Sequence, residues 1–175
     1  MPEAIIVVDV QNGFMSPASV HIPDRIKALL EQKPFEHRLF SRFSNPCGSQ
    51  YEKLLSWTRF RSSPEIDIVS TLSAYPTLVI DKHIYSCVSQ EFLDFAKAND
   101  LSEFYVCGID TDICVLKTCV DLFEHGYRPI LLSDCCMSHA GASQHQAALE
   151  ILPRFIGRRQ IILDTAQHFG VSPLK

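Results

Sequence analysis

Three residues that can together support nucleophilic catalysis are Asp9, Lys82 and Cys114. A cysteine attacks as its thiolate, and a nearby cation or a helix N-terminus favours that form. A carboxylate can accept the thiol proton and later deliver it to a leaving amine. Asp9 would do this, while Lys82 keeps Asp9 ionised or stabilises developing charge. The roles of these three residues are mutually consistent, with Cys114 as the candidate nucleophile.

The thiol of Cys114 is expected to be more acidic than an ordinary thiol. A helix start and the Lys82 cation should favour its thiolate below about pH 8.5, although the negative charge of Asp9 opposes this. Limited iodoacetamide near neutral pH should therefore modify Cys114 first. Cys135 and Cys136 lack the spacing of a redox or zinc pair, so they are interpreted as packing residues.

Short apolar runs alternate with segments of helical periodicity along the chain. In a parallel sheet with right-handed crossovers this alternation predicts helices on both faces, which is a three-layer α/β/α sandwich. Ligands bind outside the carboxyl ends of such strands, and Asp9, Lys82 and Cys114 all follow predicted strands. The predicted strands are 4–8, 37–43, 77–81, 103–107, 128–133 and 160–163.

The helical segments are expected at 23–32, 90–99, 112–124 and 142–152. Proline cannot donate an amide hydrogen bond and is unfavourable inside a helix, so Pro153 should end the last of them. The proline-rich stretch 44–76 is the least regular part and is predicted to form loops and short helices that cap the domain.

Composition excludes several classes of protein. The 175 residues suit one domain, and 16 Lys and Arg against 20 Asp and Glu give a net charge of −4 without a basic run, which disfavours nucleic-acid binding. The apolar run 4–8 is too short for a signal peptide or a membrane span, so a cytoplasmic protein without membrane contact is expected. Seven cysteines, an odd number, are expected to be reduced.

Three motifs in one order carry a resemblance to a known family. They are Asp-Val-Gln-Asn-Gly-Phe at 9–14, Lys-His-Ile-Tyr-Ser at 82–86 and Gly-Ile-Asp-Thr-Asp-Ile-Cys-Val at 108–115. The chain resembles the isochorismatase-like cysteine hydrolases, the superfamily that includes nicotinamidases and N-carbamoylsarcosine amidohydrolase. The likeness covers nearly the whole chain and implies one such hydrolase domain over 1–175, with a Rossmann-like, six-stranded, mainly parallel sheet.

The resemblance also implies a mechanism. Asp9, Lys82 and Cys114 would form a catalytic triad that hydrolyses a substrate through a thioester acyl-enzyme. A cis peptide is implied between Ile109 and Asp110, which would direct the backbone amides of Asp110 and Cys114 at an oxyanion. Losing one such donor typically costs about 100 to 1000-fold in rate.

Departures from the family narrow the expected chemistry. Nicotinamidases bind a metal through an Asp-x-His element after the second strand, where this chain has Ser-Arg-Phe-Ser-Asn-Pro at 41–46. No metal and no cofactor are therefore expected. Members that cleave the vinyl ether of isochorismate do not use a cysteine nucleophile, so Cys114 indicates an amide, carbamoyl or related acyl substrate.

Other residues receive weaker interpretations. Phe14, Tyr85 and Trp57 are candidates for an apolar wall around a small-molecule substrate. His83 and His139 lie near predicted strand ends and could reach the pocket, but the default expectation for each is ordinary polar surface.

Two other functions remain open from the sequence. The same scaffold could be a catalytically idle small-molecule-binding protein, which the intact triad argues against. A flavodoxin-like or nucleotide-binding module would suit the α/β pattern, but no glycine-rich loop follows the first predicted strand. Family members are commonly oligomeric, so a homodimer or homotetramer is expected; the sequence does not identify the substrate.

Overall fold

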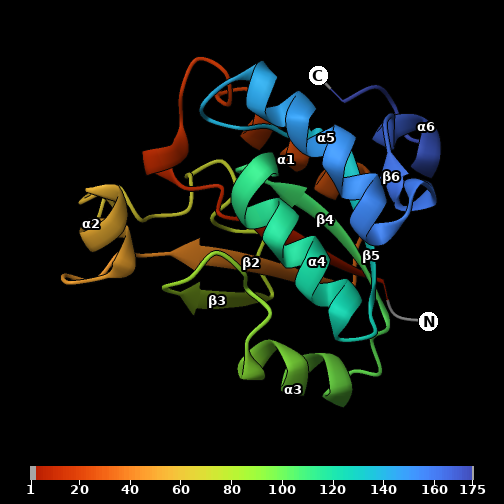
Figure 1. Ribbon diagram of the computed structural model, residues 1–175. Helices are drawn as coiled ribbons and strands as arrows, with labels where there is room; N and C mark the ends of the chain where they lie inside the picture. The colour runs from red at the N-terminus through yellow and green to blue at the C-terminus, as the bar shows by residue number, and fades with distance from the viewer. Residues whose placement is uncertain (1–2, 175) are drawn as a thin grey trace.

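A computed structural model describes residues 3–174 and shows a parallel sheet between layers of helices (Figure 1). The strand order is β3-β2-β1-β4-β5-β6, and every pairing is parallel. The predicted three-layer α/β fold is confirmed. The strands are β1 (Ala4–Val8), β2 (His37–Phe43), β3 (Leu78–Lys82), β4 (Glu103–Gly108), β5 (Arg128–Cys136) and β6 (Ile161–Ile162).

Strand β1 lies at the centre of the sheet, and all five of its residues are buried. This explains its uninterrupted apolar sequence, because helices cover both faces of a central parallel strand. At its carboxyl end β1 runs very close to β4. Gly108 has φ of +123°, and a Cβ there would lie 2.2 Å from the carbonyl oxygen of Val8. Only glycine permits this approach, which brings the residues after β1 and β4 together.

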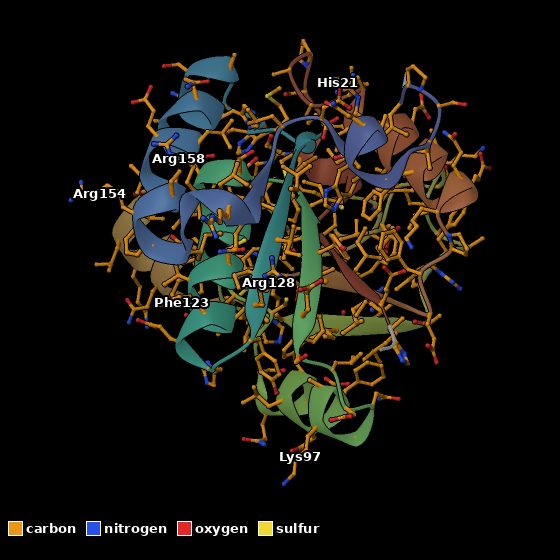
Figure 2. All side chains as sticks on the ribbon, turned by 90° about the vertical axis from the view of Figure 1, so that its right-hand side faces the viewer. His21, Lys97, Phe123, Arg128, Arg154 and Arg158 are labelled. Carbon is orange, nitrogen blue, oxygen red and sulfur yellow. The ribbon has the colours of Figure 1, made fainter. Side chains whose placement is uncertain are left out.

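The helices pack on the two faces of the sheet. In Figure 1, α4 and α5 lie side by side in front of the sheet, and α1 lies behind it. Seen from the side in Figure 2, Phe123 of α4 and Arg154 of α5 point outward into solvent. The helices are α1 (Ile22–Gln32), α2 (Gln50–Leu55), α3 (Gln90–Ala98), α4 (Leu116–Glu124), α5 (Ala142–Ile156) and α6 (Thr165–Phe169).

Two helix predictions are wrong in detail. Helix α5 continues through Pro153 to Ile156 and ends at Gly157, whose φ of 89° stops it. The chain around Pro153 remains helical because Leu152 and Ile156 are buried against the core. The segment before α4 is a π-helical turn, Thr111–Val115, rather than the start of a regular α-helix.

The irregular stretch 44–76 covers the carboxyl end of the sheet, as expected from its prolines. Gln11 ties it down, since its side-chain amide donates to the carbonyl oxygens of Phe43 (2.8 Å) and Ile66 (2.6 Å). The Ser49 hydroxyl caps α2 by accepting from the amide of Glu52. These contacts fix the segment that forms one side of the candidate site.

Between residues 3 and 174, none of the helices combines the length and apolar character that crossing a bilayer requires.

Candidate active site

The three predicted catalytic residues meet at the carboxyl edge of the sheet. Asp9 follows β1 directly with φ of 48°, a left-handed conformation that Asp tolerates better than most residues. Lys82 is the last residue of β3, and Cys114 lies in the π-helical turn after β4. All three side chains are at least nine-tenths buried.

Asp9 and Lys82 form a buried ion pair. The Lys82 Nζ lies 2.6 Å from Oδ2 of Asp9, and the two side chains are 3% and 0% exposed. Nζ also donates to the carbonyl oxygens of Ile84 (3.0 Å) and Tyr85 (2.9 Å), which occupies all three of its protons. Burial opposes the ammonium form, but the charge and hydrogen bond of Asp9 together with the nearby Cys114 and Cys87 outweigh it and raise the pKa of Lys82. Lys82 is therefore a fixed cation.

The second oxygen of Asp9 is held by Ser41 on the neighbouring strand β2. The Ser41 hydroxyl donates to Oδ1 of Asp9 at 2.6 Å and accepts a 3.2 Å bond from the Asp9 backbone amide. Sequence reasoning noted Ser41 only as a substitution for a metal ligand. Its burial and its place one strand away from Asp9 show a different role, which is to orient the carboxylate.

Cys114 lies against this pair, and its thiol is less acidic than the sequence suggested. Burial and the adjacent Asp9 carboxylate raise the pKa of the Cys114 thiol well above its ordinary value, and Lys82 only partly offsets this. The expected thiolate below pH 8.5 is therefore wrong. At rest, Cys114 is a protonated thiol that can donate its hydrogen bond to Asp9.

The backbone beside the thiol includes an amide without a hydrogen-bond partner among residues 3–174. The Ile109–Asp110 peptide is cis. Within residues 3–174 the Asp110 amide makes no hydrogen bond, and the Cys114 amide makes none to a residue outside the π-helical turn. The carbonyl oxygen of Asp110, in contrast, accepts from the amides of Ile113 and Val115. The Asp110 amide next to the Cys114 thiol is thus available to a ligand.

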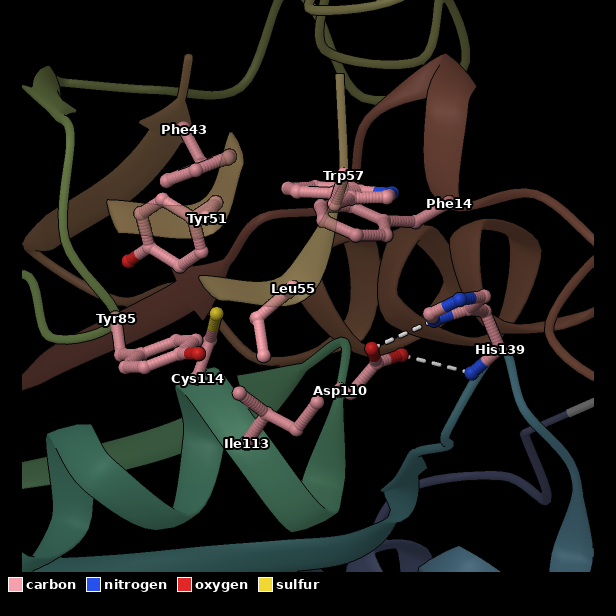
Figure 3. Close-up of a pocket in the computed structure, with 10 residues that line it drawn as sticks. All are labelled: Phe14, Phe43, Tyr51, Leu55, Trp57, Tyr85, Asp110, Ile113, Cys114 and His139. Carbon is pink, nitrogen blue, oxygen red and sulfur yellow. Dashed lines mark hydrogen bonds and ion pairs between the residues drawn. The ribbon is translucent and has the colours of Figure 1, made fainter. Parts of the chain in front are cut away.

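A cavity of about 260 Å³ opens over Cys114 (Figure 3). Its walls are mainly aromatic and aliphatic, and Phe14, Trp57 and Tyr85 are among them. The sequence analysis did not identify Phe43 and Tyr51. The lining residues are Phe14, Phe43, Tyr51, Leu55, Trp57, Tyr85, Asp110, Ile113, Cys114 and His139.

The aromatic walls are packed against one another. The rings of Phe43 and Trp57 are stacked with centroids 5.9 Å apart, and Tyr51 meets Tyr85 edge-on at 5.1 Å. Burial raises the pKa of Tyr51 to about 12, so its hydroxyl stays protonated at neutral pH. A rigid, uncharged wall of this kind suits an apolar or planar small molecule.

At another part of the cavity, Asp110 pairs with His139 from the loop after β5. The Asp110 carboxylate accepts from the His139 backbone amide at 2.7 Å, and its other oxygen lies 2.6 Å from His139 Nδ1. His139 lines the cavity, so the expectation of ordinary polar surface is wrong for this residue. The sequence feature that could have identified His139 was its position just beyond the end of a predicted strand.

The residues that replace the family's metal-binding element are engaged in other contacts. Ser41 holds Asp9, Arg42 pairs with Asp81 at 2.7 Å, and the Asn45 amide donates to the carbonyl oxygens of Trp57 and Arg59. Among residues 3–174, no group of three or more His, Cys, Asp or Glu side chains is arranged to hold a metal ion. This donor set does not fit the nicotinamidase metal.

The remaining singled-out residues lie apart from the thiol. Cys135 and Cys136 are buried, with their sulfur atoms directed to the Thr165 hydroxyl and the Leu132 carbonyl oxygen. Their burial and these contacts agree with the interpretation of both cysteines as packing residues. His83 is exposed and contacts Ser44.

The fold and this site define an α/β protein with a cysteine, a buried acid–lysine pair and a small cavity. Residues 3–160 match the family model described as the Isochorismatase domain, and the chain belongs to this family. Isochorismatase family protein 1B of Dictyostelium discoideum is 37% identical over 140 residues, which are 78% of this chain and 63% of that protein. The chain thus spans less than two thirds of this relative.

Solved structures share the fold at low sequence identity. An isochorismatase-like hydrolase from Alkaliphilus metalliredigens matches with a TM-score of 0.78 and 19% identity, over 89% of this chain and 92% of that chain. An N-carbamoylsarcosine amidase from Thermoplasma acidophilum matches with a TM-score of 0.76 and 18% identity, over 90% of this chain and 94% of that chain.

Proposed function

We propose that the protein is a metal-independent cysteine hydrolase that cleaves a small amide, carbamoyl or related C–N substrate through a thioester. The observation that carries this proposal is the burial of the Cys114 thiol against the Asp9–Lys82 pair at the cavity. Family membership and the fold shared with an amidase support hydrolysis of this kind.

In the acylation step Cys114 Sγ attacks the carbonyl carbon while its proton passes to Asp9. The negative charge that develops on the carbonyl oxygen is stabilised by the Asp110 and Cys114 amides. The C–N bond then breaks, and Asp9 returns the proton to the departing nitrogen. The products are a thioester on Cys114 and a free amine or ammonia.

In the deacylation step a water molecule attacks the thioester carbonyl carbon and gives one proton to Asp9. The C–S bond breaks, the acid product leaves, and the proton returns to the sulfur of Cys114. Asp9 thus acts as base and acid in turn, which requires that it be ionised before each attack. The Lys82 cation favours that state, and Ser41 keeps one oxygen oriented.

A protonated resting thiol agrees with this scheme. The high pKa of Cys114 means that no stable thiolate ion waits in the site. Transfer of the proton to Asp9 during attack generates the nucleophile only when a carbonyl group is in position. A thiolate of high basicity is also a strong nucleophile, so burial does not prevent catalysis.

The cavity limits the size of the substrate. At about 260 Å³ it lies near the lower end of small-molecule sites, and its Phe14, Trp57 and Tyr85 walls favour an apolar or planar group beside the scissile bond. Homo-oligomerisation, as a dimer or tetramer, remains part of the proposal, and light scattering after size-exclusion chromatography tests it.

An activity screen over small amides, ureas and carbamoyl compounds, read by ammonia release, tests the function. Turnover should be present in the wild type, absent in Cys114→Ala, and accompanied by a substrate-derived mass on Cys114 in rapidly quenched reactions. Binding without turnover across the panel would favour the idle binding protein. Normal turnover by Cys114→Ala would rule out the thioester.

A further inference from the structure

The cavity has one polar end that the proposed hydrolysis does not use. In Figure 3 the Cys114 thiol and the His139 ring are well separated, with Ile113 and Asp110 between them. The other lining side chains near His139 are apolar, and Phe14 packs its ring 5.5 Å from the imidazole. A substrate whose carbonyl group reaches Cys114 would extend its far end toward this imidazole.

His139 is held in place by three contacts. Its backbone amide and its Nδ1 both bind the Asp110 carboxylate, and its carbonyl oxygen accepts from the Ser16 hydroxyl at 3.0 Å. Because Nδ1 is engaged, Nε2 is the ring nitrogen left for a ligand. Within the described part of the chain, Nε2 has no hydrogen-bond partner.

The charged groups around His139 favour its protonated form. The hydrogen bond to Asp110 raises the pKa of His139, partial burial opposes this, and Asp112 on the π-helical turn adds to the increase. Arg59, from the irregular stretch 44–76, lowers the pKa of His139. When the ring is protonated Nε2 is a donor, whereas in the neutral ring bound through Nδ1–H it is an acceptor.

We propose that His139 binds the far end of the substrate and that the protein prefers a small amide whose far end carries an anionic acceptor such as a carboxylate. This inference rests on the proposed function. When the ring is protonated, its positive charge offsets the negative charge of the Asp110 carboxylate 2.6 Å away, so the pair does not repel such a group strongly. A cationic end would meet a protonated ring, whose Nε2–H cannot accept a hydrogen bond and whose charge has the same sign.

Two amides with the same number of carbon atoms separate these possibilities. Succinamate and butanamide have four-carbon chains and differ by a carboxylate in place of a methyl group, and 4-aminobutanamide carries a cation there instead. Binding to the Cys114→Ala protein is measured by calorimetry at about pH 6 and about pH 9, which lie on the two sides of histidine titration. Succinamate remains an anion at both values.

We expect succinamate to bind about tenfold or more tightly than butanamide at the lower pH, with the preference largely lost at the higher pH. His139→Gln, in the same Cys114→Ala background, should abolish the preference and its pH dependence. Equal binding of succinamate and butanamide, tighter binding of 4-aminobutanamide, or a preference that survives His139→Gln would overturn the inference.

The controls separate recognition from folding and from catalysis. His125→Gln changes an exposed histidine at the end of α4 and should leave binding of all three amides unchanged. Thermal unfolding identifies a misfolded variant, and His139→Phe provides a second, apolar replacement. In the active protein, His139→Gln and His139→Phe should each raise KM for the anionic substrate much more than they lower kcat.

Failure of this inference differs from failure of the proposed function. If the wild type hydrolyses amides but His139→Gln keeps the preference for succinamate, only the role of His139 is wrong. If no amide is hydrolysed, the proposed function fails, and the binding measurements in the Cys114→Ala protein still decide whether His139 recognises an anion.

Discussion

The Lys82 ammonium and the Asp9 carboxylate are 2.6 Å apart and almost wholly shielded from water. Neither charge could stay buried alone, because an isolated ion in the protein interior is strongly unfavourable. Their pairing keeps a carboxylate next to the Cys114 thiol without leaving a net charge in the core. The same two residues therefore contribute to the stability of this edge of the sheet and keep the proposed base ionised.

Removing one member of the pair should destabilise the fold more than removing both. Asp9→Asn and Lys82→Met should each lower the free energy of unfolding by about 3 to 5 kcal/mol, since each leaves one uncompensated buried charge. The double variant should recover part of that loss. Urea unfolding monitored by circular dichroism measures all three.

All three variants should lack hydrolase activity, so a stable but inactive double variant is the expected result. A double variant whose destabilisation equals the sum of the single losses would show that the two charges do not depend on each other.

The Ser41 hydroxyl should matter for rate and less for folding. Ser41→Ala removes the 2.6 Å bond to Asp9 and leaves a buried carboxylate oxygen without that donor. We expect kcat to fall about tenfold, with a loss of about 1 to 3 kcal/mol in the free energy of unfolding. Ser44→Ala is the matched control, because that hydroxyl contacts His83 away from the thiol. A rate unchanged by Ser41→Ala would exclude the orienting role.

Chelation should leave turnover unchanged. The side chains at the family's metal-binding element are Ser41, Arg42 and Asn45, and each is engaged with other protein groups. Activity is compared before and after dialysis against a strong chelator, with the metal content measured in parallel. A loss of activity that zinc or iron restores would reveal ligands outside this element and contradict metal independence.

The sequence sufficed for the fold and for the residues that meet at the sheet edge. The fully apolar run of strand β1 is typical of a central strand, and the carboxyl ends of parallel strands share one edge, so Asp9 and Lys82 were expected at the same edge although β2 lies between their strands. Pro153 misled the prediction because helix α5 is stabilised by the burial of Leu152 and Ile156 rather than by local preference.

The chemical state of the site depended on tertiary packing that no local pattern reveals. Cys114 begins a helix near a lysine, which alone would lower its pKa, but burial and the Asp9 carboxylate reverse the direction. Tyr51 and His139 come from a short helix and a loop, and only folding brings them to the same cavity as Cys114. Their roles could not be assigned from spacing.

The imidazole of His139 should titrate above an ordinary histidine. Its hydrogen bond to Asp110 stabilises the protonated ring, so its contribution to folding stability is fully present below about pH 6.5 and is lost as the pH rises through the higher pKa of the folded state. An NMR titration of the His139 ring resonances measures this pKa.

Asp110→Asn should lower the pKa of His139 toward the ordinary value, because the amide cannot provide the same charge. A His139 pKa that is unaffected by Asp110→Asn would mean that the carboxylate does not control the ring.

Alkylation of the cysteines should report the high pKa of the Cys114 thiol. Iodoacetamide reacts with thiolates, and burial next to Asp9 keeps Cys114 protonated at neutral pH, whereas Cys47 is exposed. Exposed Cys47 should therefore be modified first near pH 7, which reverses the order that the sequence suggested. The rate of Cys114 alkylation, measured by peptide mass spectrometry, should still be rising beyond about pH 9. Loss of hydrolase activity should parallel the modification of Cys114 rather than that of Cys47.

The Asp9→Asn variant makes the decisive comparison. It removes the negative charge that raises the pKa of Cys114 and leaves Lys82 free to pair with a thiolate, so Cys114 should become more reactive at neutral pH while hydrolysis is lost. Lys82→Met should have the opposite effect on alkylation, because only the unfavourable carboxylate remains. Cys47→Ser in each background removes the competing exposed thiol. If Asp9→Asn slowed the alkylation of Cys114, the Asp9 carboxylate would be promoting the thiolate at rest rather than keeping the thiol protonated. The proposed proton transfer during attack would then have to be abandoned.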